Sequence, residues 1–172
     1  MMSTGRGFSV LYNLECSFLH GSVCTLHSNH KEEAINELIQ KASVLHIIDD
    51  IKDFSREVLT REYQQTTGFG HGVAVAHAQY PGLESVIMAL GVSQKGIEYQ
   101  AMDNMPVHLL FLIASPPALQ DEYLQALSVL VKLVRQDFFF FFLLQASSIF
   151  EIEDILHTNF CTLFRKEQKY TV

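Results

Sequence analysis

The chain has 172 residues, 48% of them hydrophobic and 18% charged, with a formal net charge of −7. This composition predicts a single packed domain and argues against a disordered chain. The 12 Lys and Arg residues are outnumbered by 19 Asp and Glu residues and form no cluster, so nucleic acid is not expected as a partner. The longest apolar run, residues 138–144, falls far short of the ~20 residues that cross a membrane, and no membrane insertion is expected.

The three cysteines, Cys16, Cys24 and Cys161, are odd in number and widely spaced. No pair has the C-x-x-C spacing of a metal or redox site, so free thiols in a reducing compartment are expected. The first residues include no long apolar segment followed by a cleavage site, so no signal peptide is predicted. A cytoplasmic protein is the expectation.

Two amphipathic helices are predicted in the first half, over residues 31–42 and 48–62, because apolar residues recur there at helical spacing. Asn29, three residues before Glu32, is typical of a capped helix start. Residues 1–9, which are small and polar, are predicted to form a flexible start.

Apolar segments after the second helix predict three short strands, over residues 73–77, 86–91 and 107–114. The last is apolar on both faces, which predicts a central place in a sheet that is covered on both sides. The loosely alternating stretch 10–27 allows a further strand. The glycine-rich segment 66–72 predicts a loop before the first of the three.

Helical periodicity returns over residues 149–157 and, before that, over 123–135, where it is built on Leu124, Leu127, Leu130, Val131 and Val134. Helix, helix, three strands and two helices predict a single-domain α/β fold with one mixed β-sheet sandwiched by helices. The expected domain covers residues 10–164, followed by an exposed basic tail at 165–172.

Five consecutive phenylalanines, residues 138–142, depart most from an ordinary surface. If this segment is helical, each residue advances ~100° around the axis. Four residues then share a face that enters the core: Phe139, Phe140, Leu143 and Leu144. Phe138 and Phe142 fall on the opposite face and meet solvent, which predicts a homodimer or a partner-docking surface there. The alternative is a buried strand, since aromatic residues favour strands.

Three histidines, His71, His77 and His108, could carry chemistry, because imidazole titrates near neutral pH. His71 and His77 would project to the same side of an extended chain. The glycines of segment 66–72 let backbone N–H groups approach an anion, which suits a transferred phosphoryl group. Two alternatives stay open: His108 as an ordinary core residue, and a zinc site of all three histidines, although no H-E-x-x-H or cysteine pair accompanies them.

A longer pattern joins these residues. Arg61-Glu62 is followed by Thr67-Gly68-Phe69-Gly70-His71-Gly72-Val73-Ala74-Val75-Ala76-His77. This stretch resembles the active-site segment of the mannitol/fructose-type enzyme IIA domains of the bacterial phosphotransferase system, a family that includes the nitrogen-regulatory IIA proteins. The similarity continues through Pro81-Gly82 and Pro106-Val107-His108 and covers about residues 25–157.

The resemblance implies that His77 accepts a phosphoryl group from the phosphocarrier protein HPr or a paralogue of it. It implies that His108 supports the phosphoryl group and that the positive charge of Arg61 offsets the phosphoryl charge. A phosphoryl-binding loop is expected from four residues: Thr67, Gly68, Gly70 and Gly72. No metal or other cofactor is expected. The sequence departs from the family pattern at Ala76, usually Pro, and at Ala78-Gln79, often Gly-Lys or Gly-Arg.

The chain carries neither a IIB cysteine motif nor a permease, which fits either of two kinds of separate IIA protein. The favoured function is that of a regulatory, nitrogen-type IIA protein. The alternative within the family is a fructose- or mannitol-specific subunit that passes the phosphoryl group to a IIB component. Two hypotheses from other classes stay open. One is a non-catalytic interaction module on the same fold, and the other is a metal-dependent hydrolase.

Overall fold

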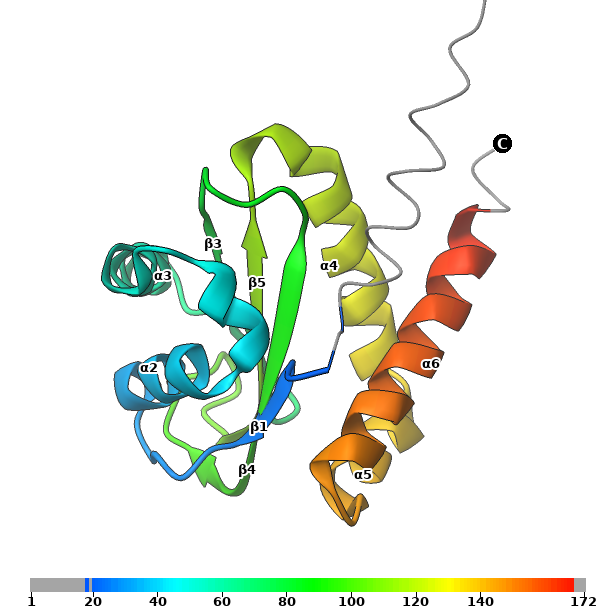
Figure 1. Cartoon of the computed structure of the whole chain (residues 1–172). Helices are drawn as coiled ribbons and strands as arrows, with labels where there is room; N and C mark the ends of the chain where they lie inside the picture. The colour runs from blue at the N-terminus through cyan, green and yellow to red at the C-terminus, as the bar shows by residue number, and fades with distance from the viewer. Residues whose placement is uncertain (1–17, 19, 169–172) are drawn as a thin grey trace, which may run out of the picture.

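The computed structural model describes residue 18 and residues 20–168, which form one sheet between two helical layers (Figure 1). The strands are β1 Val23–Thr25, β2 Gly68–Gly70, β3 Val73–Gln79, β4 Ile87–Ile97 and β5 Val107–Ser115. The helices are α2 Lys31–Lys41, α3 Ile51–Gln64, α4 Gln120–Val134, α5 Asp137–Gln145 and α6 Ile149–Gln168, with short 3₁₀ turns at Ser43–Ile47 and Pro117–Leu119. The predicted α/β sandwich with one mixed sheet is confirmed. The predicted flexible segment 1–9 lies outside the described residues.

The sheet has the strand order β1-β4-β5-β3-β2, so β5 occupies the centre as its two-sided apolar pattern predicts. It pairs in parallel with β3 and antiparallel with β4. Side chains alternate along β5: Leu110 and Leu112 enter the core under α2 and α3, and Leu109 and Phe111 enter the core under α4 to α6. All residues of β5 except His108 are buried.

Several element boundaries differ from the prediction. The first helix begins after His30, which makes no side-chain cap, so the capping role predicted for Asn29 is wrong. The second begins at Ile51, because the Asp50 side chain accepts a hydrogen bond from the backbone N–H of Asp53 and caps it there.

The sheet has five strands rather than three. Part of the predicted loop 66–72 pairs with β3 as strand β2. Strand β1 lies within residues 10–27, where the sequence allowed a further strand. The strand predicted over 86–91 continues as β4 to Ile97.

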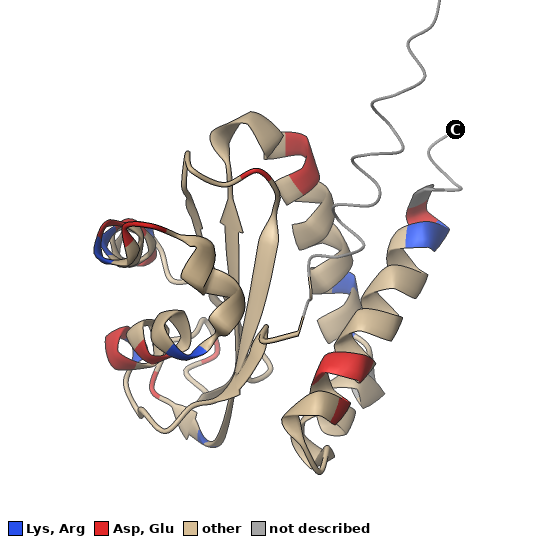
Figure 2. Ribbon diagram, viewed as in Figure 1, with Lys and Arg blue, Asp and Glu red and all other residues tan. Residues whose placement is uncertain are grey.

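The last helix runs to Gln168, so the beginning of the predicted basic tail is helical, whereas residues 169–172 lie outside the described part. Figure 2 shows Lys and Arg scattered singly or in pairs over separate elements of the described chain.

The buried face of α4 also differs from the predicted one. The pattern of leucines placed Leu124 among the buried positions, but this side chain is exposed. Leu130 is buried as predicted, and the buried face also carries Tyr123 and Ala126. Tyr123 thereby points toward the sheet from the first turn of the helix, where it faces the end of β3.

The phenylalanine segment forms helix α5, and the strand alternative is wrong. Phe139 is 3% exposed and Leu143 is fully buried, with Phe140 and Leu144 partly buried beside them. Phe138, on the opposite face, is 74% exposed. The predicted division of the rings between core and solvent is confirmed.

This division predicts different stabilities for two neighbouring substitutions. Phe139→Ala leaves a cavity between α5 and the sheet and should lower the free energy of unfolding by about 3 kcal/mol. Phe138→Ala removes a ring that is already in solvent and should change it by less than about 1 kcal/mol. Urea denaturation of both variants measures the difference. Equal losses would contradict the orientation of α5.

Candidate phosphoryl-transfer site

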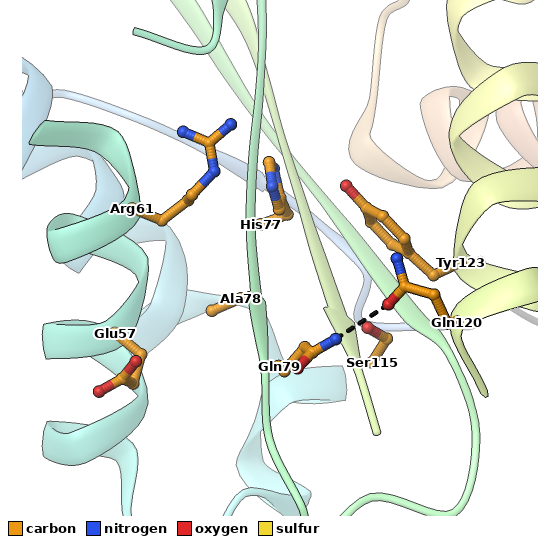
Figure 3. A pocket seen from close by; sticks show the side chains of 8 residues that line it. All are labelled: Glu57, Arg61, His77, Ala78, Gln79, Ser115, Gln120 and Tyr123. Carbon is orange, nitrogen blue, oxygen red and sulfur yellow. Dashed lines mark hydrogen bonds between the residues drawn. The ribbon is translucent and has the colours of Figure 1, made fainter. Parts of the chain in front are cut away.

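His77 lies near the end of β3, where that edge of the sheet is open. β2 pairs with β3 only at Val73 and Ala74, so it ends before reaching His77. Arg61 comes from the last turn of α3 on one side of β3, and Tyr123 comes from α4 on the other side (Figure 3). The centroids of the His77 and Tyr123 rings are 5.5 Å apart. Three elements thus bring an imidazole, a guanidinium and a phenol together.

A cavity of about 300 Å³ opens at these three side chains. Its lining residues are Glu57, Arg61, His77, Ala78, Gln79, Ser115, Gln120 and Tyr123. The Gln79 amide donates a 2.9 Å hydrogen bond to the Gln120 side-chain oxygen and closes one wall, as Figure 3 shows. Polar groups therefore surround the exposed side of the imidazole.

The His77 imidazole is held in its neutral form at neutral pH. Burial is the main cause, and it lowers the pKa below the ordinary 6.5. The bond to the Val75 carbonyl raises the pKa in part, the positive charge of Arg61 lowers it, and the Glu62 carboxylate raises it least. The His77 Nδ1 lies 3.5 Å from that carbonyl oxygen, which can only accept, so Nδ1 carries the proton. Nε2 then keeps a free lone pair, as a nucleophile requires.

Tyr123 was not predicted from the sequence as a site residue. Its ring is largely buried, and burial raises the pKa of its hydroxyl, which therefore stays protonated at neutral pH. Figure 3 shows that hydroxyl directed toward His77. The sequence signal was weak, because a tyrosine at a core position of an amphipathic helix is usually only a packing residue.

His108 does not lie beside His77, contrary to the predicted arrangement. The parallel register pairs His77 with Ile113 and Val73 with Leu109, so His108 is level with Gly72 at the far end of β3. At ~3.3 Å per residue, about 16 Å of strand separates the two histidines. The His108 Nδ1 lies 2.9 Å from the Ser93 carbonyl oxygen, and the ring packs against Phe140. This environment fits the alternative in which His108 is an ordinary core residue.

The glycine-rich segment also lies at the far end of β3, and none of the four predicted loop residues lines the cavity. Its amides already have partners, since the Thr67 N–H bonds Glu62 and the His71 N–H bonds Asp103. Gly70 and Gly72 have the positive φ angles of +99° and +75° that favour glycine. Gly70 and Gly72 therefore allow the tight turn between β2 and β3, and this turn accounts for them without an anion-binding role.

Glu62 explains how α3 is anchored beside the site. This carboxylate is only 3% exposed, yet it accepts hydrogen bonds from the Thr67 backbone and hydroxyl and from the Tyr99 hydroxyl. The Lys31 ammonium lies 3.3 Å from it. Because Glu62 directly follows Arg61, these bonds fix the end of α3 from which Arg61 reaches His77.

The zinc alternative finds no geometric support, because His77 lies about 16 Å of strand away from the end of β3 where His71 and His108 lie. Within residues 20–168, no group of three or more His, Cys, Asp or Glu side chains is arranged to hold a metal ion. Among the described helices, none is both long and apolar enough to cross a membrane.

Comparison with known proteins identifies the family. Residues 19–159 match the family described as phosphoenolpyruvate-dependent sugar phosphotransferase system, EIIA 2. The chain belongs to this family. An EIIA domain is a phosphotransferase component, so the chain has a general role in phosphotransfer.

Relatives of this EIIA domain carry two kinds of name. A fructose-specific EIIA component of Haloferax volcanii is 34% identical over 126 residues, which cover 73% of this chain and 82% of the relative. A nitrogen regulatory protein of Bradyrhizobium diazoefficiens is 34% identical over 110 residues, covering 64% and 71%. The fructose-specific EIIABC component of Bacillus subtilis is 31% identical over 140 residues, and the match spans only 22% of its length.

Solved structures show the same fold. The nitrogen regulatory protein IIA-Ntr of Neisseria meningitidis has a TM-score of 0.71 at 25% identity, covering 78% of this chain and 91% of that one. The enzyme IIA in the Escherichia coli complex with phosphorylated enzyme IIB for mannitol has a TM-score of 0.63 at 17% identity, covering 81% and 96%.

The His77 environment predicts a pH titration. The imidazole should titrate below 6.5, and Arg61→Gln should raise the midpoint because a neighbouring cation is lost. Since the unfolded chain binds this proton more tightly, His77 also reduces the stability of the fold as the pH drops below about 6.5. Nuclear magnetic resonance of the imidazole measures the midpoint.

Arg56→Gln is the matched control, because Arg56 is exposed on the same helix and paired with Asp53. It should leave the His77 midpoint unchanged. A midpoint at or above 6.5 in the wild type would contradict the assignment.

Proposed function

We propose that this EIIA domain carries its phosphoryl group on Nε2 of His77, received from an HPr-like phosphocarrier protein. The observation that carries the proposal is the neutral imidazole between the Arg61 guanidinium and the Tyr123 hydroxyl in an open cavity. Phosphoryl transfer requires mainly positioning and neutralisation of charge on the phosphoryl oxygens.

The proposed step is a nucleophilic displacement at phosphorus. The Nε2 lone pair of His77 attacks the phosphohistidine of the donor. The P–Nε2 bond forms while the donor P–N bond breaks, and its electron pair returns to the donor nitrogen. The donor ring takes up a proton, and His77 gives up its Nδ1 proton through solvent, so charge and protons balance. The lowered pKa of His77 keeps the attacking lone pair available at neutral pH.

Two neighbours stabilise the transferring group in this proposal. Arg61 supplies the positive charge, and its side chain is already oriented by a 3.3 Å hydrogen bond from Nη1 to the Gln65 carbonyl. Tyr123 supplies a neutral hydroxyl as donor to a phosphoryl oxygen. It takes the supporting place that the sequence had given to His108.

We infer further that the domain has the regulatory, nitrogen-type role, in which protein targets read its phosphorylation state. The Bradyrhizobium relative and the Neisseria structure, both named nitrogen regulatory, support this. The Haloferax relative supports the alternative of a fructose-specific subunit. Rapid transfer of label from the phosphorylated domain to a purified fructose-type IIB component would favour the sugar-specific role, and label retained on the domain would favour the regulatory role.

Labelling identifies the acceptor. With enzyme I, HPr and ³²P-labelled phosphoenolpyruvate, the wild type should acquire acid-labile label, and His77→Ala should acquire none. His108→Ala is the control, because His108 lies about 16 Å of strand away, and it should label and transfer normally. Label that persists on a folded His77→Ala variant would sink the assignment, and an unlabelled wild type would favour the non-catalytic interaction module.

Rates of phosphoryl transfer test the proposed roles of Arg61 and Tyr123. Arg61→Ala should slow phosphoryl transfer about 10²–10³-fold, because one charged donor to the phosphoryl group is lost. Tyr123→Phe keeps the ring and removes only the hydroxyl, and a loss of about tenfold is expected. Quenched-flow labelling measures both rates. A drop of several degrees in melting temperature with unchanged kinetics would mean that Arg61 is purely structural.

A further inference from the structure

One face of the molecule carries an exposed aromatic cluster. It consists of Phe138, Phe141 and Phe142 on α5 and Phe150 at the start of α6, and we call it the aromatic face. Each of these side chains is between 59% and 75% exposed. The same helix anchors Phe139 and Leu143 in the core, so the exposed rings are held on a fixed support. A fixed aromatic patch of this kind marks an interface.

A cavity of about 630 Å³ adjoins the aromatic face at the beginning of α5. Its aromatic lining comes from Phe69, Phe140 and Phe141, and Arg135 and His71 lie among the remaining lining residues. A cavity of this size and lining can accept a phenylalanine ring from a partner.

Opposite charges flank the aromatic face. Arg135 comes just before α5 and lines the cavity. Glu151, in the first turn of α6, follows Phe150. Its carboxylate accepts 2.7 Å hydrogen bonds from the Ser147 hydroxyl and backbone N–H, which lower its pKa, so it is charged at neutral pH. Along the chain, Arg135 and Asp137 precede the rings and Glu151 follows them, and Arg135 is the charged residue that lines the cavity.

We propose that the aromatic face binds a second copy of this chain about a two-fold axis, with the two α5 helices antiparallel. A surface that presents Arg135 beside the cavity and Glu151 beyond the rings is complementary to itself when one copy is reversed. Arg135 of each copy then faces Glu151 of the other. Phe142 lies near the axis, and Phe150 of one copy reaches the cavity beside Arg135 of the other.

The size of the patch sets the strength of the dimer. Four exposed phenylalanines per copy can bury on the order of 1,000 Å² in total, which is near the lower limit for a specific interface. A dissociation constant in the micromolar range is expected. An anionic membrane fits less well, because the first turns of α6 carry the carboxylates of Glu151 and Asp154 beside the rings.

The aromatic face and the His77 cavity lie at opposite ends of β3. A Cβ atom on Gly72 would lie 2.9 Å from the ring of Phe140, so α5 packs where β3 begins. His77 is five residues further along that strand. Dimerisation therefore leaves both His77 cavities open to other proteins, and this proposal does not depend on the role of His77.

Sedimentation velocity over about 1–200 µM tests the dimer. The wild type should show a monomer–dimer equilibrium, and Phe138→Ser/Phe142→Ser should weaken it at least 100-fold while keeping the wild-type circular dichroism and melting temperature. The matched control is Ile47→Ser/Met102→Ser, which removes two exposed apolar side chains elsewhere and should still dimerise. A wild type that stays monomeric, or an aromatic variant that dimerises as the wild type does, would overturn the proposal.

A charge exchange tests the antiparallel arrangement. Arg135→Glu alone and Glu151→Arg alone should each weaken the dimer about tenfold, because like charges then meet twice in each homodimer. An equimolar mixture of the two variants should restore dimerisation to within about threefold of the wild type, since both pairs are again opposite. A mixture that stays monomeric would overturn the arrangement. A second measurement is cosedimentation with phosphatidylglycerol vesicles. If the wild type is monomeric and binds the vesicles, and Phe138→Ser/Phe142→Ser does not bind them, the aromatic face is assigned to membranes instead.

Discussion

The parallel pairing of β3 with β5 is the constraint on which the site depends. It sets His77 opposite Ile113 and near the end of its strand, beyond the point where β2 stops covering the edge. An imidazole earlier on the same face of β3, where Val73 and Val75 lie, would be enclosed in the core under α4 to α6. At this position it is buried enough for its pKa to fall, yet one side of the ring faces an open cavity. In the proposed function the imidazole exchanges a phosphoryl group between proteins, and it needs both properties.

The buried carboxylate of Glu62 complements this register from the side of α3. A charge that is almost fully buried is tolerated only when it is paired and hydrogen-bonded. Thr67, Tyr99 and Lys31 meet that requirement, and the bonds to Thr67 tie the end of α3 to the start of β2. The same bonds restrict Arg61, the preceding residue, to the open edge beside His77. The glycine-rich segment contributes to this anchoring, which explains its place in the motif without an anion bound to it.

The two ends of the sheet have different chemistry. At the end of β3 the exposed groups are polar and surround a small cavity, as suits the transfer of an anionic group. At the other end, α5 presents phenylalanine rings to solvent beside a larger, aromatic cavity. Because the two surfaces lie at opposite ends of β3, the proposed partner on the aromatic face and the proposed phosphoryl donor at His77 can bind the same molecule without competing.

The sequence by itself determined the features that depend on local patterns. Hydrophobic periodicity predicted the helices, the central position of β5 and the division of the α5 rings between core and solvent, because burial at a given spacing is a property of neighbouring residues. The motif that ends in His77 identified the family. Only the tertiary structure decided which side chains meet. The strand register separated His108 from His77, and the packing of α4 brought Tyr123 to it. Both depend on contacts between distant segments, and a local pattern carries no information about the register in which two strands pair or about the rotation of a helix on the sheet.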